Sequence, residues 1–201
     1  ARGWRVAVID HAMGHSAPEG ALEIGGVDLT DSAQADAALG RVVGRFGRLD
    51  ALLNIAGGFV WQTTDDAAPA WDRMFALNLS TALHASRAAL PHLKASDAGR
   101  IVNVGSAAAL KAGAGMGAYG ASKAAVHALT QSLAEELKTT AVTVNAVLPS
   151  IIDTPANRAD MRNADPAQWV APADLAAVIL FLASPESRAM TGALVPVTGR
   201  V

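Results

Sequence analysis

The stretch YGASK places Tyr119 four residues before Lys123. In a helix, residues four apart lie on one face with neighbouring Cβ atoms. A free tyrosine, with a pKa of about 10, is a poor base at neutral pH, and a nearby ammonium group favours the phenolate and eases proton transfer. For an isolated Y-x-x-x-K, the commoner explanation is that both side chains snorkel at a helix edge. The pair is a candidate for acid–base chemistry that needs support from other residues.

Two further polar residues give that support. Ser106 ends the apolar run RIVNVGS, at the end of a strand where parallel α/β sheets bind ligands. Its hydroxyl would bond a substrate oxygen and stabilise charge developing there, although a serine at a strand end is also ordinary turn chemistry. Asn78 lies in the helical pattern FALNLS, where asparagine has poor propensity. It would hold a water or the lysine, or simply face solvent.

Short apolar runs alternate with longer helical patterns along the chain. This alternation is typical of a parallel sheet with helices on both faces, in one α/β domain over residues 1–201. We expect helices at about 31–46, 66–92, 118–138 and 172–183, and flexible loops at GAGMG and over 151–170. The expected strands are WRVAVI at 4–9, ALEIGGVDL at 21–29, LDALLNIA at 49–56, RIVNVGS at 100–106, VTVNAVLPS at 142–150 and ALVPVT at 193–198.

Composition narrows the class of protein. The 201 residues are 51% hydrophobic, enough for one buried core. A net charge of -2 without a basic stripe argues against nucleic acid and anionic membrane as partners. No apolar run approaches the roughly 18 residues of a membrane span. The absence of cysteine excludes thiolate metal sites and agrees with a cytoplasmic location.

The first strand pattern, GWRVAVID, has the character of a second strand ending in an acidic residue, Asp10. In a doubly wound sheet the first strand normally runs into a Gly-rich turn that holds a cofactor pyrophosphate. No G-x-x-x-G-x-G precedes GWRVAVID. We therefore expect the natural protein to carry about 20 to 30 further N-terminal residues, the size of a typical βα unit.

Together, Asn78, Ser106, Tyr119 and Lys123, with NIAGG at 54–58 and LPSIIDTP at 148–155, resemble the short-chain dehydrogenase/reductase family over essentially the whole chain. The resemblance implies a Rossmann-type doubly wound sheet in three α/β/α layers and a nicotinamide dinucleotide cofactor. It also implies that Tyr119 donates or accepts the proton, while Lys123 holds the nicotinamide ribose and depresses the tyrosine pKa. Ser106 would orient the substrate oxygen, and Asn78 would support a proton-relay water.

Cofactor contacts carry over from the same resemblance. Asp10 would accept bonds from the adenosine ribose, and its carboxylate would repel a 2′-phosphate, which favours NAD(H) over NADP(H); otherwise Asp10 merely starts a turn. The remaining implied contacts are Asp28 and Leu29 beside the adenine, the Asn54, Ala56 and Gly57 backbone, and Pro149, Ile152 and Thr154 beside the nicotinamide amide. Ser150 replaces the family's usual glycine after Pro149.

Within the family, the C-terminal half is similar to dihydropteridine reductases, through GMGAYGASKAAVHALTQSL and the Asp-Thr-Pro, Asn-Arg and Trp positions of the following loop. Dihydropteridine reductases lack the active-site serine, however, and Ser106 is present here. The leading expectation is a reductase or dehydrogenase of a small carbonyl or alcohol. The alternatives are pterin reduction, and a non-catalytic subunit that keeps the fold without the pyrophosphate turn.

The loop 153–170 is expected to cover the substrate. Met161 and Trp169 would line an apolar pocket, and Asn157 or Arg158 would meet a polar substrate group, although a tryptophan in such a loop more often packs the loop down. The five histidines are scattered without metal spacing, so we predict no metal, and His127 is interpreted as a packing or interface residue. By resemblance, helices 66–92 and 118–138 would pair across a two-fold axis in a dimer or homotetramer.

Overall fold

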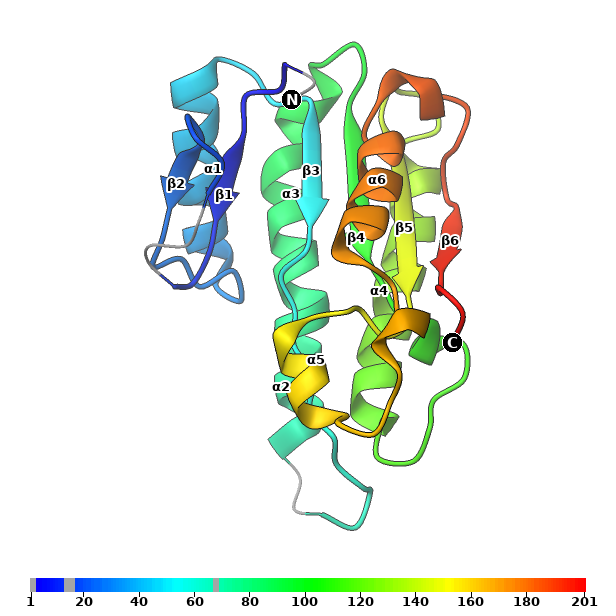
Figure 1. Cartoon of the computed structure of the whole chain (residues 1–201). Helices are drawn as coiled ribbons and strands as arrows, with labels where there is room; N and C mark the ends of the chain where they lie inside the picture. Colours follow the sequence, from blue (N-terminus) through cyan, green and yellow to red (C-terminus); the bar gives the residue numbers. More distant parts are fainter. Residues whose placement is uncertain (1–2, 13–16, 67–68) are drawn as a thin grey trace.

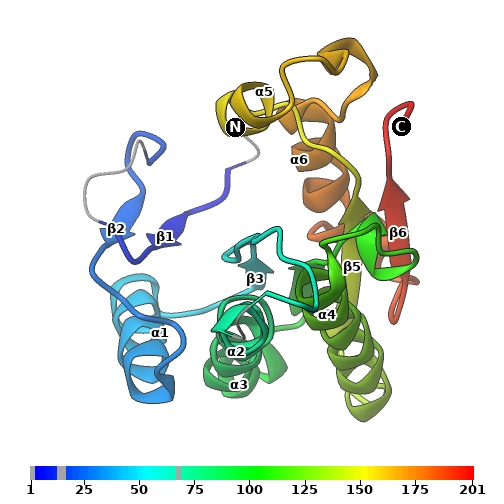
Figure 2. The same cartoon turned by 90° about the horizontal axis from the view of Figure 1, so that it is seen from below.

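The computed structural model describes residues 3–12, 17–66 and 69–201, which form a three-layer α/β/α arrangement (Figure 1). All paired strands are parallel, in a two-stranded sheet β1-β2 and a four-stranded sheet ordered β3-β4-β5-β6. Helices α1, α3 and α4 cover one face of the strands and α6 covers the other, as Figure 2 shows from below. The strands are β1 (Ala7–Ile9), β2 (Leu22–Ile24), β3 (Ala51–Asn54), β4 (Arg100–Val104), β5 (Thr143–Pro149) and β6 (Leu194–Val197).

Local residues mark the ends of α1 and the start of α6. Asp31 accepts hydrogen bonds from the amides of Ala33 and Gln34 at the start of α1, and Gly47, with a φ of 76°, ends that helix. Pro172 stands in the first turn of α6, as the sequence predicted. The α-helices are α1 (Ser32–Phe46), α2 (Pro69–Phe75), α3 (Thr81–Lys94), α4 (Gly117–Glu136), α5 (Pro155–Asp160) and α6 (Pro172–Leu182).

The helix expected over about 66–92 is interrupted. A π-helical turn, Ala76–Ser80, separates α2 from α3, and it places the buried Asn78 at its centre. Such a turn contains one extra residue relative to an α-helix and is found most often at functional sites. Residues 67–68 of the expected helix lie outside the described part of the chain.

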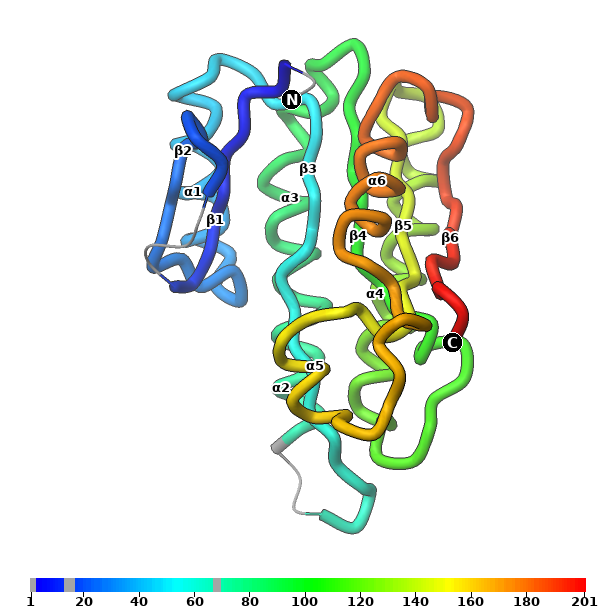
Figure 3. The backbone as a smooth tube through the Cα atoms, viewed as in Figure 1, coloured from blue at the N-terminus to red at the C-terminus, as the bar shows by residue number. Residues whose placement is uncertain are grey.

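The segment 151–170 is more ordered than its loop-like sequence suggests. It contains α5 and a 3₁₀ turn, Pro166–Gln168, and a bridge between Ile152 and Val170 closes its base. The tube in Figure 3 shows it running beyond the carboxyl ends of the strands before it returns to α6. The expectation of a flexible loop here was wrong, because Thr154 caps α5 and Asn157 bonds back to the main chain of Ile152.

Alternating strand residues bury their side chains in two core clusters, one on each face of the sheet. The cluster under α1, α3 and α4 includes Leu39, Leu93, Ile101, Leu133, Leu137 and Val144. The cluster under α6 includes Val102, Val147, Leu175, Ile179 and Leu182. No helix within the described residues is long and apolar enough to cross a membrane.

A chain of buried polar side chains links the sheet to two of its helices. Asn54 and Asn103 are register partners on β3 and β4, and the Asn54 amide donates to Asn103 Oδ1 at 2.8 Å and to Ser86 Oγ of α3 at 3.1 Å. Asn103 in turn donates to Thr130 Oγ1 of α4 at 2.8 Å. Satisfied buried bonds of this kind fix one arrangement of the elements. They hold α3 and α4 in register with the strand ends that lead into the site.

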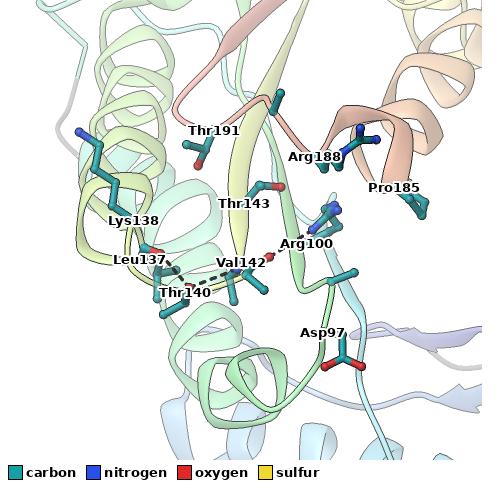
Figure 4. Close-up of a pocket in the computed structure, with 13 residues that line it drawn as sticks. Asp97, Arg100, Leu137, Lys138, Thr140, Val142, Thr143, Pro185, Arg188 and Thr191 are labelled. Atoms are coloured by element: carbon teal, nitrogen blue, oxygen red, sulfur yellow. Dashed lines mark hydrogen bonds between the residues drawn. The ribbon is translucent and has the colours of Figure 1, made fainter.

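We expect Thr143→Val to stabilise the fold. The Thr143 hydroxyl, at the start of β5 beside Arg100 (Figure 4), is buried and has no hydrogen-bond partner among the described residues. An unsatisfied buried hydroxyl costs about 1–3 kcal/mol, and valine keeps the shape without the polar atom. Urea unfolding should show a rise of about 1 kcal/mol. The control is Thr130→Val, which breaks two buried bonds and should destabilise the protein; equal loss in both variants would contradict the prediction.

Candidate active site

Four of the residues singled out in the sequence lie at the carboxyl end of the sheet. Ser106 follows β4, Tyr119 and Lys123 occupy the first two turns of α4, and Asn78 lies in the π-helical turn. Asn78, Ser106 and Lys123 are at most 5% exposed, and Tyr119 is partly buried. The structure therefore brings together residues that are up to 45 positions apart in the sequence, at the edge where parallel sheets bind ligands.

Tyr119 and Ser106 are neighbours in this cluster. The Ser106 side chain acts on the Tyr119 hydroxyl, in the direction that lowers its pKa. The Ser106 hydroxyl also accepts a bond from the amide of Ala108 at 3.1 Å, which fixes its direction. The Phe59 ring meets the Tyr119 ring edge to face, with centroids 5.0 Å apart. The Phe59 ring thus packs against the Tyr119 ring, while the Tyr119 hydroxyl lies beside Ser106.

Burial shifts the pKa values of both titratable groups of the pair. It raises the pKa of Tyr119, and Ser106 only partly offsets this rise. Burial also lowers the pKa of Lys123 to about 8. The Lys123 Nζ donates to the carbonyl of Val104 at 2.8 Å. That Lys123 depresses the tyrosine pKa stays a prediction, because burial and Ser106 are the causes that shift the Tyr119 pKa here.

Asn78 holds the loop that follows β3. Its Oδ1 accepts from the amide of Gly58 at 2.9 Å, while its Nδ2 donates to the Gly58 carbonyl at 3.1 Å and to Ser122 Oγ at 2.9 Å. Ser122, which sequence reasoning did not single out, passes the connection on by donating to the Tyr119 carbonyl at 2.8 Å. Only its place between Tyr119 and Lys123 in YGASK would have drawn attention to it.

Gly57 lies against the same cluster. A Cβ atom there would stand 2.6 Å from Asn78 Oδ1 and 3.4 Å from Lys123 Nζ. A side chain does not fit without a shift of Asn78, so a residue without one is required for this close approach. The structure thus gives a physical reason for a glycine in NIAGG. The Asn54 side chain is turned into the core, so only its main chain can serve the site.

The residues expected at the adenosine end of a cofactor come together at the ends of β1 and β2. Asp10 and β2 are joined by a bond from the Asp10 amide to the Ile24 carbonyl, and Val27 donates back to the Asp10 carbonyl, each at 3.1 Å. Asp28 accepts two bonds from Thr30, which lower the pKa of its carboxyl. Leu29 follows directly, and its carbonyl lies 3.2 Å from His84 Nδ1 of α3.

The residues expected near the nicotinamide lie at the base of the covering segment. Pro149 ends β5, Ile152 forms the bridge to Val170, and Thr154 caps α5. Ser150, which replaces the family's glycine, donates its hydroxyl to the Thr198 carbonyl at 2.7 Å. The turn after β5 is therefore fastened to the strand beside it.

The residues of the covering segment that were expected to contact the substrate differ in their exposure. Met161 is partly exposed at the end of α5, whereas Trp169 is 7% exposed and its main chain lies beside Gly199 near the C-terminus. Arg158 forms a two-pronged ion pair with Asp153 and Asn157 bonds within the loop, so both polar groups are already engaged. Of the two apolar side chains expected at the substrate, Met161 is thus the more exposed.

Two main-chain segments are fastened together beside Tyr119. The amide of Gln62 donates to the Gly115 carbonyl at 2.8 Å, and Trp61 Nε1 donates to the Ala114 carbonyl at 3.1 Å. Gly115 has a φ of 74°, and a Cβ there would collide with the Trp61 indole. The glycine-rich approach to Tyr119 is thus closed against the loop that carries Phe59.

A pocket of about 620 Å³ lies at the opposite end of the sheet, where β4 and β5 begin (Figure 4). Arg100, buried in its wall, donates to the carbonyls of Gly99, Ala141 and Ser184. Through these bonds, Arg100 connects the ends of neighbouring strands and helices. The pocket does not include Asn78, Ser106, Tyr119 or Lys123 in its lining.

Comparisons with known proteins agree on one family. A family model described as short chain dehydrogenase matches residues 6–165. A Vibrio cholerae 3-oxoacyl-[acyl-carrier-protein] reductase is 32% identical over 185 residues, covering 86% of this chain and 75% of the relative. A Rhizobium meliloti D-beta-hydroxybutyrate dehydrogenase is 38% identical over 129 residues, covering 64% of this chain and 50% of the relative.

An uncharacterized oxidoreductase of Staphylococcus epidermidis is 37% identical over 129 residues, and the match spans 64% of this chain and 56% of that protein. Among solved structures, a short-chain type dehydrogenase/reductase from Mycobacterium ulcerans superposes with a TM-score of 0.82 at 27% identity, over 90% of this chain and 70% of that one. This neighbour confirms the Rossmann-type fold expected from the sequence. The likeness to dihydropteridine reductases is not shown by these comparisons.

Proposed function

Because the chain belongs to the short-chain dehydrogenase/reductase family, we propose that it is a nicotinamide-dependent oxidoreductase of a small carbonyl or alcohol, with Tyr119 as the proton donor or acceptor. The observation that carries this proposal is the buried cluster in which Ser106 lies beside Tyr119 and Lys123 lies one turn further along α4. The nicotinamide cofactor is proposed from the family membership, and Tyr119 is proposed as the acid from its place in the cluster.

In the reducing direction, the substrate carbonyl oxygen would accept bonds from the Ser106 and Tyr119 hydroxyls. Ser106 is held in direction by the Ala108 amide, so its bond to that oxygen needs little reorganisation. A bound nicotinamide would supply the hydride to the carbonyl carbon. Tyr119 then gives its proton to the oxygen, which completes the alcohol. Its raised pKa supports this donor role at neutral pH, and alkaline conditions favour the reverse reaction.

The residues present fit a nicotinamide dinucleotide. The main chain at Gly57 lies beside Lys123 and has no room for a side chain, as close backbone approach to a ligand requires. Lys123 would hold the nicotinamide ribose, Asp10, Asp28 and Leu29 the adenosine end, Ala56 and Gly57 the middle, and Pro149, Ile152 and Thr154 the nicotinamide amide. Asp10 supports NAD(H) over NADP(H), because its carboxylate would repel a 2′-phosphate.

Asn78 has a second role in this proposal. Its side-chain amide is engaged by Gly58 and Ser122, so it fastens the Gly57–Gly58 main chain in place. We propose that this positioning accompanies the support of a proton-relay water expected from the family resemblance.

The substrate is proposed to be a small molecule with an apolar group beside the reacting carbon. Phe59 is 53% exposed while touching Tyr119, and Met161 lies on the covering segment. The names of the relatives, a hydroxybutyrate dehydrogenase and an oxoacyl reductase, support a carbonyl or alcohol rather than a pterin. A cytoplasmic homo-oligomer, dimer or tetramer, is proposed from the family.

The complete polypeptide should bind NADH in a fluorescence titration and reduce members of a ketone panel. We expect Ser106→Ala to lower kcat for ketones by about 100-fold, because it removes one oxyanion donor, while NADH binding is unchanged. Ser187→Ala is the matched control, since Ser187 is buried at the other end of the sheet and bonds only main-chain carbonyls.

Three outcomes would change the proposal. Failure of the complete polypeptide to bind NADH would favour the non-catalytic alternative. Turnover of quinonoid dihydropterin that survives Ser106→Ala, without ketone turnover, would favour pterin reduction. Full ketone activity in Ser106→Ala would remove the role assigned to the serine.

A further inference from the structure

His127, one turn beyond Lys123 on α4, touches the residue that orients the substrate. Its imidazole is 6% exposed, and its Nε2 lies 3.4 Å from the amide nitrogen of Ser106 in hydrogen-bonding geometry. The ring lies so close to the preceding residue that a Cβ at Gly105 would stand 2.4 Å from Nε2. The glycine in NVGS therefore makes room for the imidazole, and the ring packs directly on the Gly105–Ser106 main chain.

This contact defines the protonation state of the ring. The Ser106 amide is a donor, so Nε2 must be the unprotonated nitrogen and the proton of the neutral ring is on Nδ1. The charged group that acts on His127 is Lys123, one turn back on α4. From the strands, the His127 ring meets the Gly105–Ser106 main chain and, beside the same glycine, the Leu148 side chain of β5. Burial first, and then the Lys123 charge, lower the pKa of His127 and keep the ring neutral.

Both the main-chain amide and the side-chain hydroxyl of Ser106 are consequently held by hydrogen bonds. Its hydroxyl accepts from the Ala108 amide and lies beside Tyr119, and its amide donates to His127. We propose that His127 is a positioning residue, whose Nε2 accepts the Ser106 amide proton and thereby keeps the Ser106 hydroxyl directed at Tyr119 and the substrate oxygen. This inference rests on the proposed function for its catalytic meaning, and on the geometry alone for the contact.

Protonation of His127 breaks the arrangement. An imidazolium carries a proton on Nε2, so two donors would face each other across the Ser106 amide, and the ring would also gain a charge beside Lys123. Ser106 would then move away from Tyr119. Carbonyl reduction should therefore show an acidic limb in its pH profile, with activity lost as the pH falls through the His127 pKa.

Two substitutions of similar size separate acceptance from packing. Gln at position 127 offers an amide oxygen that can accept from Ser106 and does not titrate, whereas Leu fills the space without an acceptor. We expect His127→Leu to lower the ketone kcat about fivefold to tenfold, the equivalent of one hydrogen bond, with the KM for NADH unchanged. His127→Gln should keep kcat within about threefold of the wild type and lose the acidic limb. His92→Gln, on α3, is the control that should keep the limb.

A measurement independent of activity tests the contact itself. In ¹H–¹⁵N spectra of the complete polypeptide, the Ser106 amide should shift with the titration of His127 in the wild type and stay constant in His127→Gln. A Ser106 amide that does not follow the histidine overturns the inference, as does a His127→Leu enzyme with wild-type kcat and an intact acidic limb. If the protein has no reductase activity, the proposed function fails, and the amide titration still decides the contact.

Discussion

Tyr119→Phe is expected to lower kcat for ketone reduction by about 1,000-fold, within the range that a positioned general acid contributes. The substitution removes only the hydroxyl. The ring stays in its apolar cluster with Ala70, Met74 and Ala118 and keeps its edge-to-face contact with Phe59. NADH affinity and the urea unfolding midpoint should therefore change little. Steady-state kinetics with a ketone from the panel, beside both binding and unfolding measurements, checks all three.

The wild-type protein offers a direct reading of the same group. Tyr119 is the single tyrosine of the chain, so the ultraviolet absorbance of tyrosinate reports this residue alone. Burial raises the pKa of Tyr119. In a pH titration, the tyrosinate absorbance should therefore appear with a midpoint above pH ~10, the usual tyrosine pKa. A Tyr119→Phe variant whose kcat stays within about tenfold of the wild type would contradict the role of Tyr119 as the acid. A tyrosine that ionises near neutral pH would contradict the raised pKa.

Lys123→Met is expected to stabilise the protein at pH 7 while it disables the site. Burial lowers the lysine pKa from 10.5 to about 8, and each unit corresponds to about 1.4 kcal/mol. The lost bond to the Val104 carbonyl offsets about 1 kcal/mol of this gain. Urea unfolding should show a net increase of roughly 2 kcal/mol. NADH affinity should fall at least tenfold and ketone kcat about 100-fold, because the ammonium group beside Gly57 is gone.

The pH dependence gives the same prediction a second readout. Between about pH 8 and 10.5 the unfolded chain keeps the lysine proton that the folded protein has released, so the folded state gains stability as the pH rises through this window. The stability is present above the unfolded pKa and is lost as the pH falls through about 8. The difference between wild type and Lys123→Met should shrink across that window. Lys138→Met, at an exposed lysine paired with Glu135, should leave NADH binding unchanged.

Large parts of the fold followed from local patterns. β-branched runs separated by helical spacing predicted all six described strands, because buried parallel strands need near-continuous apolar sequence. The lengths of the strands were overestimated. The strand expected over 21–29, for example, includes Gly25 and Gly26, whereas the paired residues of β2 end at Ile24. Where a strand stops depends on its neighbour, and the sequence of one strand does not contain that information.

The candidate site was predicted in part for the same reason. The i, i+4 spacing of YGASK is local, so it predicts that Tyr119 and Lys123 share a face of α4. The clamp of Asn78 on Gly58 and the contact of His127 with Ser106 join segments 20 and 21 residues apart. Such contacts depend on how helices pack on the sheet. The raised pKa of Tyr119 likewise comes from burial, which spacing does not reveal.

The π-helical turn at Ala76–Ser80 has a consequence for how this site is inherited. Because such a turn holds one residue more than an α-helix needs, an in-frame deletion of a single codon would convert it to a regular turn. The helices on either side would survive, but Asn78 would rotate away from Gly58 and Ser122 and release both. One mutational event could thus remove the site while keeping the fold, so the site depends on the length of this short segment as well as on its residues.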